Sequence, residues 1–382
     1  MKGNKDAPIL LAMPQENALI RSAARLAHLP FRLFAQRAFV PPKKALILQP
    51  CCLSHAMLTT PLLATLSENF PQTQFDWAVN DTARPAIAGN PRLTELVRVK
   101  GNNLYEMSWA NLNELVQQLR DRSYDSCFIP SRSSLLAWVA WQANIPQRIG
   151  LSAGGRGFAH TLAVRPPTGE VHETAVYLEI ANAIGLNTGV DAFSPMEFYP
   201  QDEDRTAVTQ RLIDELEWLG DTPLIIMHPG GGDNTVPHDP RKQWPIERFV
   251  LLANRLIRQH NANLLLVGGK QDMSAVAAIN GMMAGKSSNW AGKITLGQLG
   301  ALAEIGNLYI GNDTGPTHIA TAVGCPTLAI FGPSDPAISG PYSQTAKIIT
   351  LQHEKDKRPF SWEHGVDVET AVRAATTLLN PS

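Results

Sequence analysis

One stretch near the C-terminus, residues 301–336, constrains the fold of this chain more than any other. It predicts a short apolar strand at residues 308–310, a polar turn at residues 311–318 that opens a helix, and a second strand at residues 326–331. The first N–H groups of a helix lack internal partners, and the helix dipole favours an anion beside them. The stretch therefore indicates an α/β protein with either a phosphate site or an ordinary strand–turn–helix joint at this turn.

The turn carries several polar groups that a phosphate site would use. Thr314 and Thr317 offer hydroxyl donors, and Pro316 suits the first turn of a helix. Asp313 could cap the helix, position the loop or contact a sugar. His318 could also position the loop or contact a sugar, although a structural histidine is the commoner outcome.

Two other stretches repeat the pattern of a strand that ends in glycines. Residues 224–245 contain an apolar strand that runs into Gly230, Gly231 and Gly232 and then into a basic Trp-Pro turn. Residues 264–272 contain another strand that ends in a Gly-Gly turn. We expect these strand ends to share one edge of a sheet, the edge where open α/β sheets bind ligands. The three stretches together favour the phosphate site.

Four motifs carry a resemblance to a known family. They are HPGGG at residues 228–232, K-x-W-P at residues 242–245, GG-x-x-D at residues 268–272, and NDTGPTHIA followed by GCPTLAIFGPSDP within residues 312–336. With these motifs in this order, the chain resembles glycosyltransferase family 9, the heptosyltransferases of bacterial lipopolysaccharide core assembly. The resemblance extends from about residue 43 onward. The resemblance implies the GT-B fold, with two facing Rossmann-like domains and parallel sheets. It also implies inverting, metal-independent sugar transfer from a nucleotide donor that the C-terminal half binds.

Composition bounds the remaining possibilities. The chain has 382 residues, which suit two domains of ordinary size, and its net charge of −1 does not suggest nucleic-acid binding. Its four cysteines show no zinc spacing and are expected to be free thiols in a reducing cytosol. No apolar run is long enough to span a membrane, so we expect a cytoplasmic protein. The acids Asp202 and Asp204 form an Asp-x-Asp at a helix start, where they complement the dipole, so neither a metal nor a cofactor is expected.

The chain divides into four parts. They are a basic arm at residues 1–42, an acceptor-side domain at residues 43–200, a nucleotide-sugar domain at residues 201–365, and a C-terminal helix at residues 366–382 that crosses back to the first domain, as the family's terminal helix does. The arm carries four arginines and no acid between Leu19 and Val40. It could lie peripherally in a membrane interface, pack on the protein's own surface, or form a loose tail.

The first strand is expected at residues 44–49, and the loop that follows it departs from the sequence pattern of the family. Family members usually carry a Gly-Asp pair there, and the acid is the proposed general base; the matching pair here is Ser54-His55. Imidazole can take a hydroxyl proton near neutral pH, so His55 is the candidate base. Alternatively, His55 caps or packs the helix, and Asp81, Asp239 or no residue acts as base.

The resemblance assigns donor-binding roles in the second domain. Lys242 is the best cation for the diphosphate, and the backbone and hydroxyl groups of Thr314, Gly315 and Thr317 are the best neutral donors. Asp272 matches the family's acid for the ribose hydroxyls, or else it caps the next helix. The three glycines at residues 230–232 allow close approach to the ligand.

Arg132, in the first domain, could meet an acidic acceptor or be a solvated surface arginine. The expected partners are thus a nucleotide-diphosphate sugar, by resemblance an adenosine diphosphate sugar, and a glycolipid or oligosaccharide acceptor. Three alternatives stay open: transfer of a different sugar on the same scaffold, nucleotide-sugar binding without transfer, and epimerisation of a sugar nucleotide.

Overall fold

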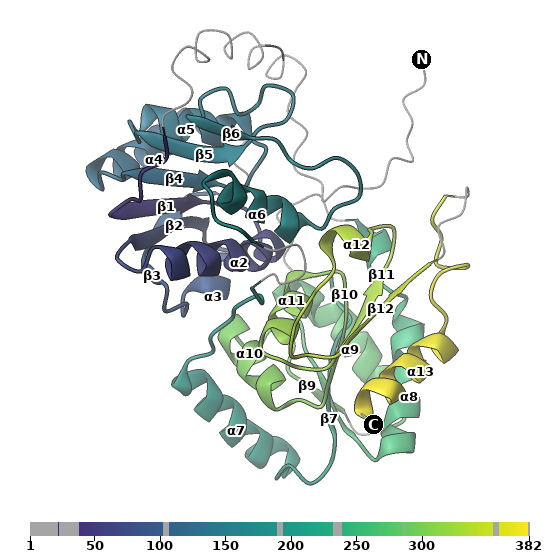
Figure 1. Ribbon diagram of the computed structural model, residues 1–382. Helices are drawn as coiled ribbons and strands as arrows, with labels where there is room; N and C mark the ends of the chain where they lie inside the picture. The colour runs from purple at the N-terminus through teal and green to yellow at the C-terminus, as the bar shows by residue number, and fades with distance from the viewer. Residues whose placement is uncertain are drawn as a thin grey trace. The chain divides into compact units, whose positions relative to one another are not determined.

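The computed structural model describes residues 22, 38–101, 107–188, 194–231, 239–285, 287–353 and 359–380. These residues form two compact units that divide between Ser194 and Pro195, called here the N-terminal unit and the C-terminal unit. Each unit is built around its own six-stranded parallel sheet (Figure 1).

The N-terminal sheet has the strand order β3-β2-β1-β4-β5-β6. Its strands are β1 (Lys44–Leu48), β2 (Gln74–Asn80), β3 (Leu93–Val99), β4 (Ser126–Ile129), β5 (Gln147–Leu151) and β6 (Leu162–Val164). The helices of this unit are α2 (Leu53–Asn69), α3 (Arg84–Ile87), α4 (Trp109–Asp121), α5 (Ser134–Gln142) and α6 (Glu173–Ala183). A parallel sheet in this unit is what the resemblance to glycosyltransferase family 9 implied.

The C-terminal sheet has the order β12-β11-β10-β7-β8-β9. Its strands are β7 (Leu224–His228), β8 (Asn263–Leu266), β9 (Ser287–Asn289), β10 (Leu308–Asn312), β11 (Thr327–Phe331) and β12 (Ile348–Gln352). The helices of this unit are α7 (Asp202–Leu216), α8 (Ile246–His260), α9 (Met273–Met282), α10 (Leu296–Ile305), α11 (Gly315–Ala322), α12 (Pro336–Ser339) and α13 (Val368–Leu379), with 3₁₀ turns η3 (Pro240–Lys242) and η4 (Lys270–Asp272).

Both sheets form because their central strands are apolar runs that helices cover on both faces. All five residues of β7 and all five of β10 are buried. Helix α8 covers one face with a stripe of side chains three and four residues apart: Phe249, Leu252, Ala253 and Leu256. Trp244 packs edge-on against Phe249, with 5.0 Å between ring centroids, and extends this core toward the carboxyl ends of the strands.

Each sheet contains a topological switch point. In the N-terminal unit the chain builds outward from β1 through β2 to β3, and β4 then pairs with the other side of β1. In the C-terminal unit β7, β8 and β9 run outward, and β10 then pairs with the other side of β7. Ligands of open α/β sheets bind at the carboxyl ends of the strands that flank such a point. The fold therefore directs attention to the loops after β1, β4, β7 and β10.

The terminal helix, expected within residues 366–382, packs on the C-terminal unit. Helix α13 contacts α8 and the strands β10, β11 and β12, all of the C-terminal unit. Its buried residues Ala371, Val372 and Ala375 join the same core as β7 and α8. The apolar face of α13 is thus covered by the C-terminal unit, and the crossing back to the first domain that the resemblance implied stays a prediction.

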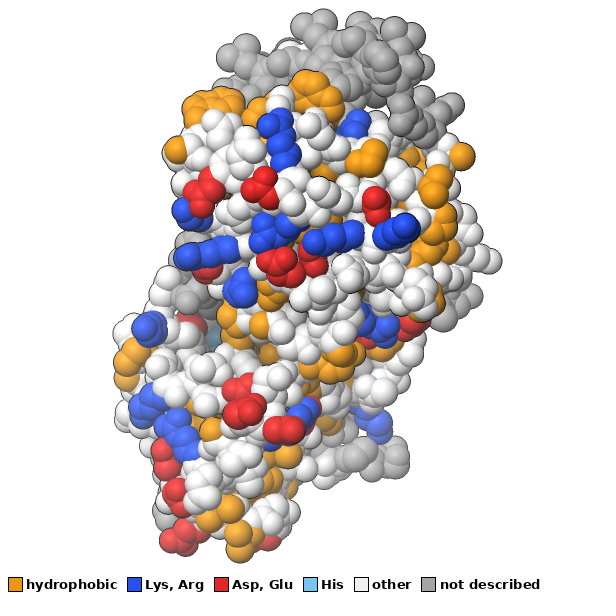
Figure 2. Space-filling view, turned by 90° about the vertical axis from the view of Figure 1, so that its left-hand side faces the viewer, with side chains coloured by type: hydrophobic (Ala, Val, Ile, Leu, Met, Phe, Trp, Pro, Cys, Tyr) orange, Lys and Arg blue, Asp and Glu red, His pale blue; other side chains and the backbone are white. Residues whose placement is uncertain are grey.

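Ion pairs lie at several places on the described surface. Figure 2 shows Lys and Arg side chains in a row on one face, with acidic side chains among them. In the N-terminal unit such pairs join Arg98 to Asp81, Lys100 to Glu114, and Arg122 to Glu95. Within the described ranges no helix combines the length and the apolar character that crossing a membrane requires. The arm at residues 1–42 lies outside the described residues, apart from residues 22 and 38–42.

Candidate functional site

The loop after β7 is held by a buried carboxylate from the loop after β8. Asp272 is 6% exposed; its Oδ1 accepts a hydrogen bond from the Gly231 N–H at 3.1 Å, and its Oδ2 accepts one from the Gly269 N–H at 2.9 Å. His228 Nε2 lies 3.4 Å from Oδ2. Asp272 therefore ties together two of the three glycine-bearing strand ends that the sequence singled out.

This tie explains one glycine of the HPGGG motif. A Cβ at Gly230 would lie 2.1 Å from the Asp272 carboxyl group, so no side chain fits there. The Asp272 side chain does not cap α9. It accepts the hydrogen bond from the Gly269 N–H at the start of η4 instead. Its role toward a ribose stays a prediction, and Gly232 lies outside the described residues.

Lys242 and the loop after β10 meet in an ion pair. Lys242 Nζ lies 2.8 Å from Asp313 Oδ2, and the Lys242 side chain is 20% exposed. Asp313 Oδ2 also accepts a 2.6 Å hydrogen bond from Ser334 Oγ. Asp313 does not cap α11, because Thr314 is the N-cap residue and forms no side-chain cap. The structure thus brings the K-x-W-P and NDTG motifs together and orients the Lys242 ammonium through Asp313.

Asn312, the last residue of β10, connects the loop after β7 with the turn that contains Trp244. Its Nδ2 donates to Pro229 O at 2.9 Å and to Gly230 O at 3.1 Å, and its Oδ1 accepts from Trp244 N at 3.0 Å. The side chain is fully buried. Sequence analysis did not assign Asn312 a role, although a polar residue between an apolar strand and a turn was a usable signal, because an amide can both donate and accept.

The remaining residues of this turn are buried. Thr317 Oγ1 donates to Asn312 O at 2.6 Å. Its hydroxyl proton is therefore used within the loop and is not available to a ligand in this arrangement. Thr314 Oγ1 lies 3.4 Å from Thr317 Oγ1. Gly315 begins α11, and His318 is 1% exposed within it. Together the described parts of the loops after β7, β8 and β10 bring backbone groups and the Lys242 ammonium to one edge of the sheet, an arrangement that suits a phosphate-bearing ligand.

His55 lies in the first turn of α2, after β1. Its imidazole is 4% exposed, and its Nδ1 lies 2.5 Å from Tyr177 Oη, on α6. Cys52, the N-cap residue of α2, has a φ of 42°, which is a strained value for a residue with a Cβ. Ser54 lies beside His55 and is half-buried. Strain of this kind clusters at functional sites, so the loop is a candidate reaction site.

Arg132 follows β4, on the other side of the same switch point. Its Nη1 donates to Glu173 Oε1 at 3.1 Å and to Oε2 at 3.3 Å. Glu173 is 3% exposed and begins α6, one turn before Tyr177. Burial, followed by the charge of Glu173, raises the pKa of the Tyr177 hydroxyl well above its ordinary value. Sequence analysis missed Glu173 and Tyr177, which lie far from His55 in the chain.

The two alternative bases are held by arginines. Asp81 forms a two-point contact with Arg98, at 2.8 and 2.6 Å, and this hydrogen bonding lowers the pKa of Asp81. Asp239 is bound by Arg241 in the same way, which lowers the pKa of Asp239. A carboxylate with a lowered pKa is a weaker base, so both are poorer candidates than His55.

The acids that suggested a metal motif are structural. Asp204 Oδ2 accepts from Gln201 N in a capping box, and Asp202 pairs with Arg205. In the part of the chain that the structure describes, no group of three His, Cys, Asp or Glu side chains could hold a metal ion.

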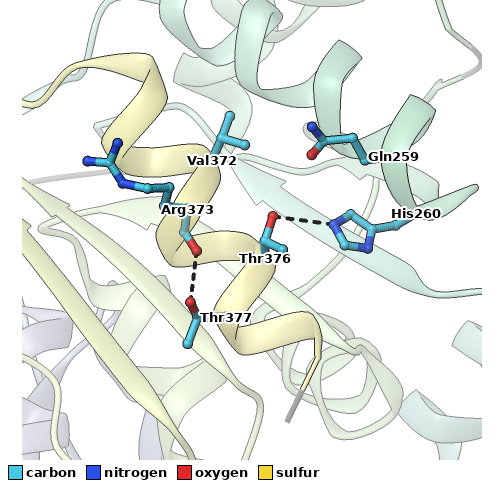
Figure 3. Close-up of a pocket in the computed structure, with 6 residues that line it drawn as sticks. All are labelled: Gln259, His260, Val372, Arg373, Thr376 and Thr377. Atoms are coloured by element: carbon cyan, nitrogen blue, oxygen red, sulfur yellow. Dashed lines mark hydrogen bonds between the residues drawn. The ribbon is translucent and has the colours of Figure 1, made fainter. Parts of the chain in front are cut away.

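A hollow of about 550 Å³ lies elsewhere, between α8 and α13 (Figure 3). His260 and Thr376 approach each other there, with 3.4 Å between His260 Nε2 and Thr376 Oγ1. The end of α8 leads directly into β8, so this hollow lies toward the amino ends of the strands. It is therefore separate from the loops after β7 and β10.

Comparisons with known proteins agree with the fold and the motifs. The model of the family "Glycosyltransferase family 9 (heptosyltransferase)" matches residues 112–364. Lipopolysaccharide heptosyltransferase 2 of Salmonella typhimurium is 26% identical over 314 residues, which are 81% of this chain and 88% of that protein. The protein of the same name from Escherichia coli K12 is 26% identical over 315 residues, with the same coverage.

Solved structures share the architecture. A family 9 glycosyltransferase from Veillonella parvula has a TM-score of 0.78 and 24% identity, and the match covers 91% of this chain and 100% of that one. The E. coli ADP-heptose lipopolysaccharide heptosyltransferase II has a TM-score of 0.69 and 22% identity, covering 88% of this chain and 98% of that one. The fold is GT-B, built from two Rossmann-like α/β domains, as the resemblance implied. The chain is a glycosyltransferase and belongs to glycosyltransferase family 9.

Proposed function

We propose that this enzyme transfers a heptose from an adenosine diphosphate donor to a lipopolysaccharide-core acceptor, with inversion and without a metal. The relatives named above are lipopolysaccharide heptosyltransferases, which supports this donor and acceptor class. In the reaction the acceptor hydroxyl attacks the anomeric carbon, and the bond from that carbon to the diphosphate oxygen breaks with its electron pair. The hydroxyl proton passes to a base.

The observation that carries the proposal is the meeting of Lys242, Asp313 and Asn312 at the C-terminal switch point. A departing diphosphate gains negative charge, which fixed donors must stabilise. Lys242 supplies a positive charge whose position is set by Asp313. Asn312 and Asp272 hold the surrounding loops, so their backbone groups need little reorganisation when the charge develops.

Calorimetric titration of adenosine diphosphate tests the donor site. Lys242→Ala should weaken binding by ~1–3 kcal/mol, the range for losing a charge-assisted contact. Lys242→Arg keeps a cation beside Asp313 and separates lost charge from a disturbed loop. Lys293→Ala is the matched control, because Lys293 Nζ lies in the same unit and donates to Asn289 O. Unchanged affinity in Lys242→Ala would remove this lysine from the donor site.

His55 is the proposed base, with an imidazole that must be neutral to accept the proton. A carboxylate stays deprotonated at lower pH than an imidazole does, so a carboxylate at this position would extend transfer to lower pH. One observation favours a second candidate, nucleotide-sugar binding without transfer: the family's acid is absent at the Ser54-His55 position. A wild-type chain that binds the nucleotide but transfers sugar to no acceptor would support that candidate.

We also propose that residues 1–42 bind the membrane surface that displays the acceptor. Four arginines and no acid lie between Leu19 and Val40, and each basic residue near an anionic surface contributes ~1 kcal/mol. Sedimentation with anionic vesicles should recover the full chain and leave a chain that begins at Lys43 in solution. Equal recovery of both would contradict the proposal.

A further inference from the structure

We propose that Ser334 is a positioning residue that fixes the direction of the Lys242 ammonium by holding the carboxylate of Asp313. Ser334 lies in the loop after β11, residues 332–336 with the sequence GPSDP, called here the β11 loop. The inference rests on the proposed function, in which Lys242 binds the diphosphate of the donor. It gives a role to a motif that the loops after β7, β8 and β10 do not include.

Asp313 accepts hydrogen bonds from two side chains on one oxygen. Lys242 Nζ lies 2.8 Å from Asp313 Oδ2, and Ser334 Oγ donates to the same oxygen at 2.6 Å. The direction of both bonds follows from chemistry, because an ammonium only donates and an ionised carboxylate only accepts. Ser334 is 3% exposed and Asp313 6%, so water has little access to replace either bond.

Two donors on one oxygen restrict how the carboxylate can turn. The last torsion of an aspartate side chain is soft, so a carboxylate with one donor can rotate and carry its partner along. Rotation of Asp313 would move Oδ2 away from Lys242 and Ser334 together, and both bonds would be lost. Ser334 therefore limits the ammonium to one position. An ammonium has three protons, and Asp313 is its ion-pair partner among the described residues, so protons remain for a ligand.

Two features hold the β11 loop in place. Gln352, the last residue of β12, pairs with the last residue of β11 in the sheet, and its Nε2 donates to Ser334 O at 2.8 Å. At the start of the loop, a Cβ at Gly332 would lie 2.3 Å from Arg241 O and 3.2 Å from the Cα of Lys242. Glycine thus lets η3 pack directly on this loop. The β11 loop therefore supports both the backbone and the side chain of the lysine.

Loss of the Ser334 hydroxyl should loosen the ammonium without removing its charge. In Ser334→Ala the Asp313 carboxylate keeps Lys242 as a donor and loses the second donor that fixes its rotation. A diphosphate must then order the lysine as it binds, which costs side-chain entropy. We expect the Kd for adenosine diphosphate to rise about 3–10-fold, the effect of one ordinary hydrogen bond.

NMR of lysine side chains tests the positioning without any ligand. The full chain is labelled at lysine Cε and Nζ, and the Lys242 signals are assigned by their loss in Lys242→Arg. Ser334→Ala should shift these signals, because the ammonium leaves its single position. Unchanged Lys242 signals in Ser334→Ala overturn the inference. If Ser334→Ala does not fold, Ser334→Cys keeps the size of the side chain, offers only a weak donor, and takes its place in the test.

Thr327→Val is the matched control. Thr327 begins β11, at the opposite end of that strand from the β11 loop, and its buried hydroxyl donates to Cys325 O at 2.8 Å. The substitution removes a buried hydroxyl from the same strand, so it should lower stability similarly but leave the Lys242 signals and the nucleotide affinity unchanged. Equal shifts of the Lys242 signals in Thr327→Val and Ser334→Ala would show a general loosening of β11 and would overturn the positioning role.

A double-mutant cycle then separates this inference from the proposed function. Adenosine diphosphate is titrated by calorimetry into the wild type, Ser334→Ala, Lys242→Ala and the double variant. If Ser334 acts through Lys242, the double variant binds like Lys242→Ala.

Two outcomes of the cycle overturn the positioning role and leave the donor site standing, provided that Lys242→Ala binds more weakly than the wild type. In the first, Ser334→Ala binds like the wild type. In the second, the double variant is weaker than Lys242→Ala by the full effect of Ser334→Ala. If Ser334→Ala shifts the Lys242 signals but Lys242→Ala binds the nucleotide like the wild type, the proposed donor site fails and the positioning of the ammonium stands.

Discussion

The two switch points of this enzyme present different kinds of groups on the same architecture. At the carboxyl ends of β1 and β4, the N-terminal unit presents ionisable side chains in two contacts: His55 with Tyr177, and Arg132 with the buried Glu173. At the carboxyl ends of β7 and β10, the C-terminal unit presents mostly backbone, which Asp272 and Asn312 hold in place beside the one lysine of the K-x-W-P motif.

The difference matches two different chemical tasks. Proton transfer needs one lone pair in a fixed orientation, which a short chain of buried side chains can provide. Binding a diphosphate needs several donors whose positions do not change, which clamped backbone can provide. We therefore expect changes at the first edge to affect turnover and changes at the second to affect nucleotide affinity or the integrity of the loops.

The largest effect should follow the loss of the base. His55→Ala should lower kcat by about 10²–10⁴-fold, the usual range for general acid–base catalysis. His55→Asp should restore part of the rate and extend activity to lower pH, because a carboxylate remains deprotonated there. Steady-state kinetics across pH 5 to 9, measured with purified acceptor, provides the check. Full turnover in His55→Ala would move the base elsewhere.

The next effect concerns the loops of the C-terminal edge. Gly230→Ala places a Cβ 2.1 Å from the Asp272 carboxyl group, so the tie between the β7 and β8 loops must break or shift. We expect a loss of about 3 kcal/mol in the free energy of unfolding, the upper range for overpacking, together with weaker nucleotide binding. Chemical denaturation measures the first quantity.

A second glycine provides the control for that prediction. Gly281, in α9, has nothing within 4 Å of the position that a Cβ would take. Gly281→Ala should raise the free energy of unfolding by about 0.5–1 kcal/mol, because alanine favours a helix over glycine. Equal effects of the two alanines would contradict the role given to Asp272.

Acid should affect the N-terminal unit through His160. Burial lowers the pKa of His160 to about 4. An unfolded histidine binds its proton below a pH of about 6.5, so between that pH and about 4 the unfolded chain binds more protons than the folded one. Stability should therefore fall as the pH drops through this window, by roughly 2–3 kcal/mol from this residue.

His160→Gln removes that titration. Its free energy of unfolding should change less between pH 6.5 and 4 than that of the wild type, with both referenced to pH 8. Hydrogen exchange of peptides from the N-terminal unit would locate the effect. Parallel pH curves for the two proteins would contradict it.

The smallest effect concerns strain at the start of α2. Cys52 has a φ of 42°, which glycine adopts without the cost paid by residues with a Cβ. Cys52→Gly should therefore be more stable than Cys52→Ala by about 1 kcal/mol. Thermal denaturation of the two variants compares them directly, and a more stable alanine variant would show that the strain is absent in solution.

The sequence predicted the features that depend on local pattern. The apolar runs of β1, β7 and β10, and the glycines after β7, indicated parallel sheets, because a buried parallel strand requires such a run. Strand β9, with the sequence SSN, has no apolar pattern and was missed. The packing of α13 was also not predictable, since an amphipathic helix shows which face is buried but not which unit covers it.

The candidate site was less accessible to sequence reasoning. Motif spacing brought Lys242 to attention, but its ion pair with Asp313 joins residues 71 positions apart, and only the folded chain reveals it. Tyr177 lies 122 positions from His55 and shares no motif with it. A contact between residues so far apart in the sequence, such as that of His55 with Tyr177, depends on how α2 and α6 pack. No local sequence pattern encodes that packing.

One measurement tests the central comparison most directly: the affinity for adenosine diphosphate, by calorimetry, of His55→Ala and Lys242→Ala side by side with the wild type. If the two edges divide the work as proposed, His55→Ala binds like the wild type, and Lys242→Ala loses ~1–3 kcal/mol. Weakened binding in His55→Ala together with unchanged binding in Lys242→Ala would contradict the division between a reacting edge and a binding edge.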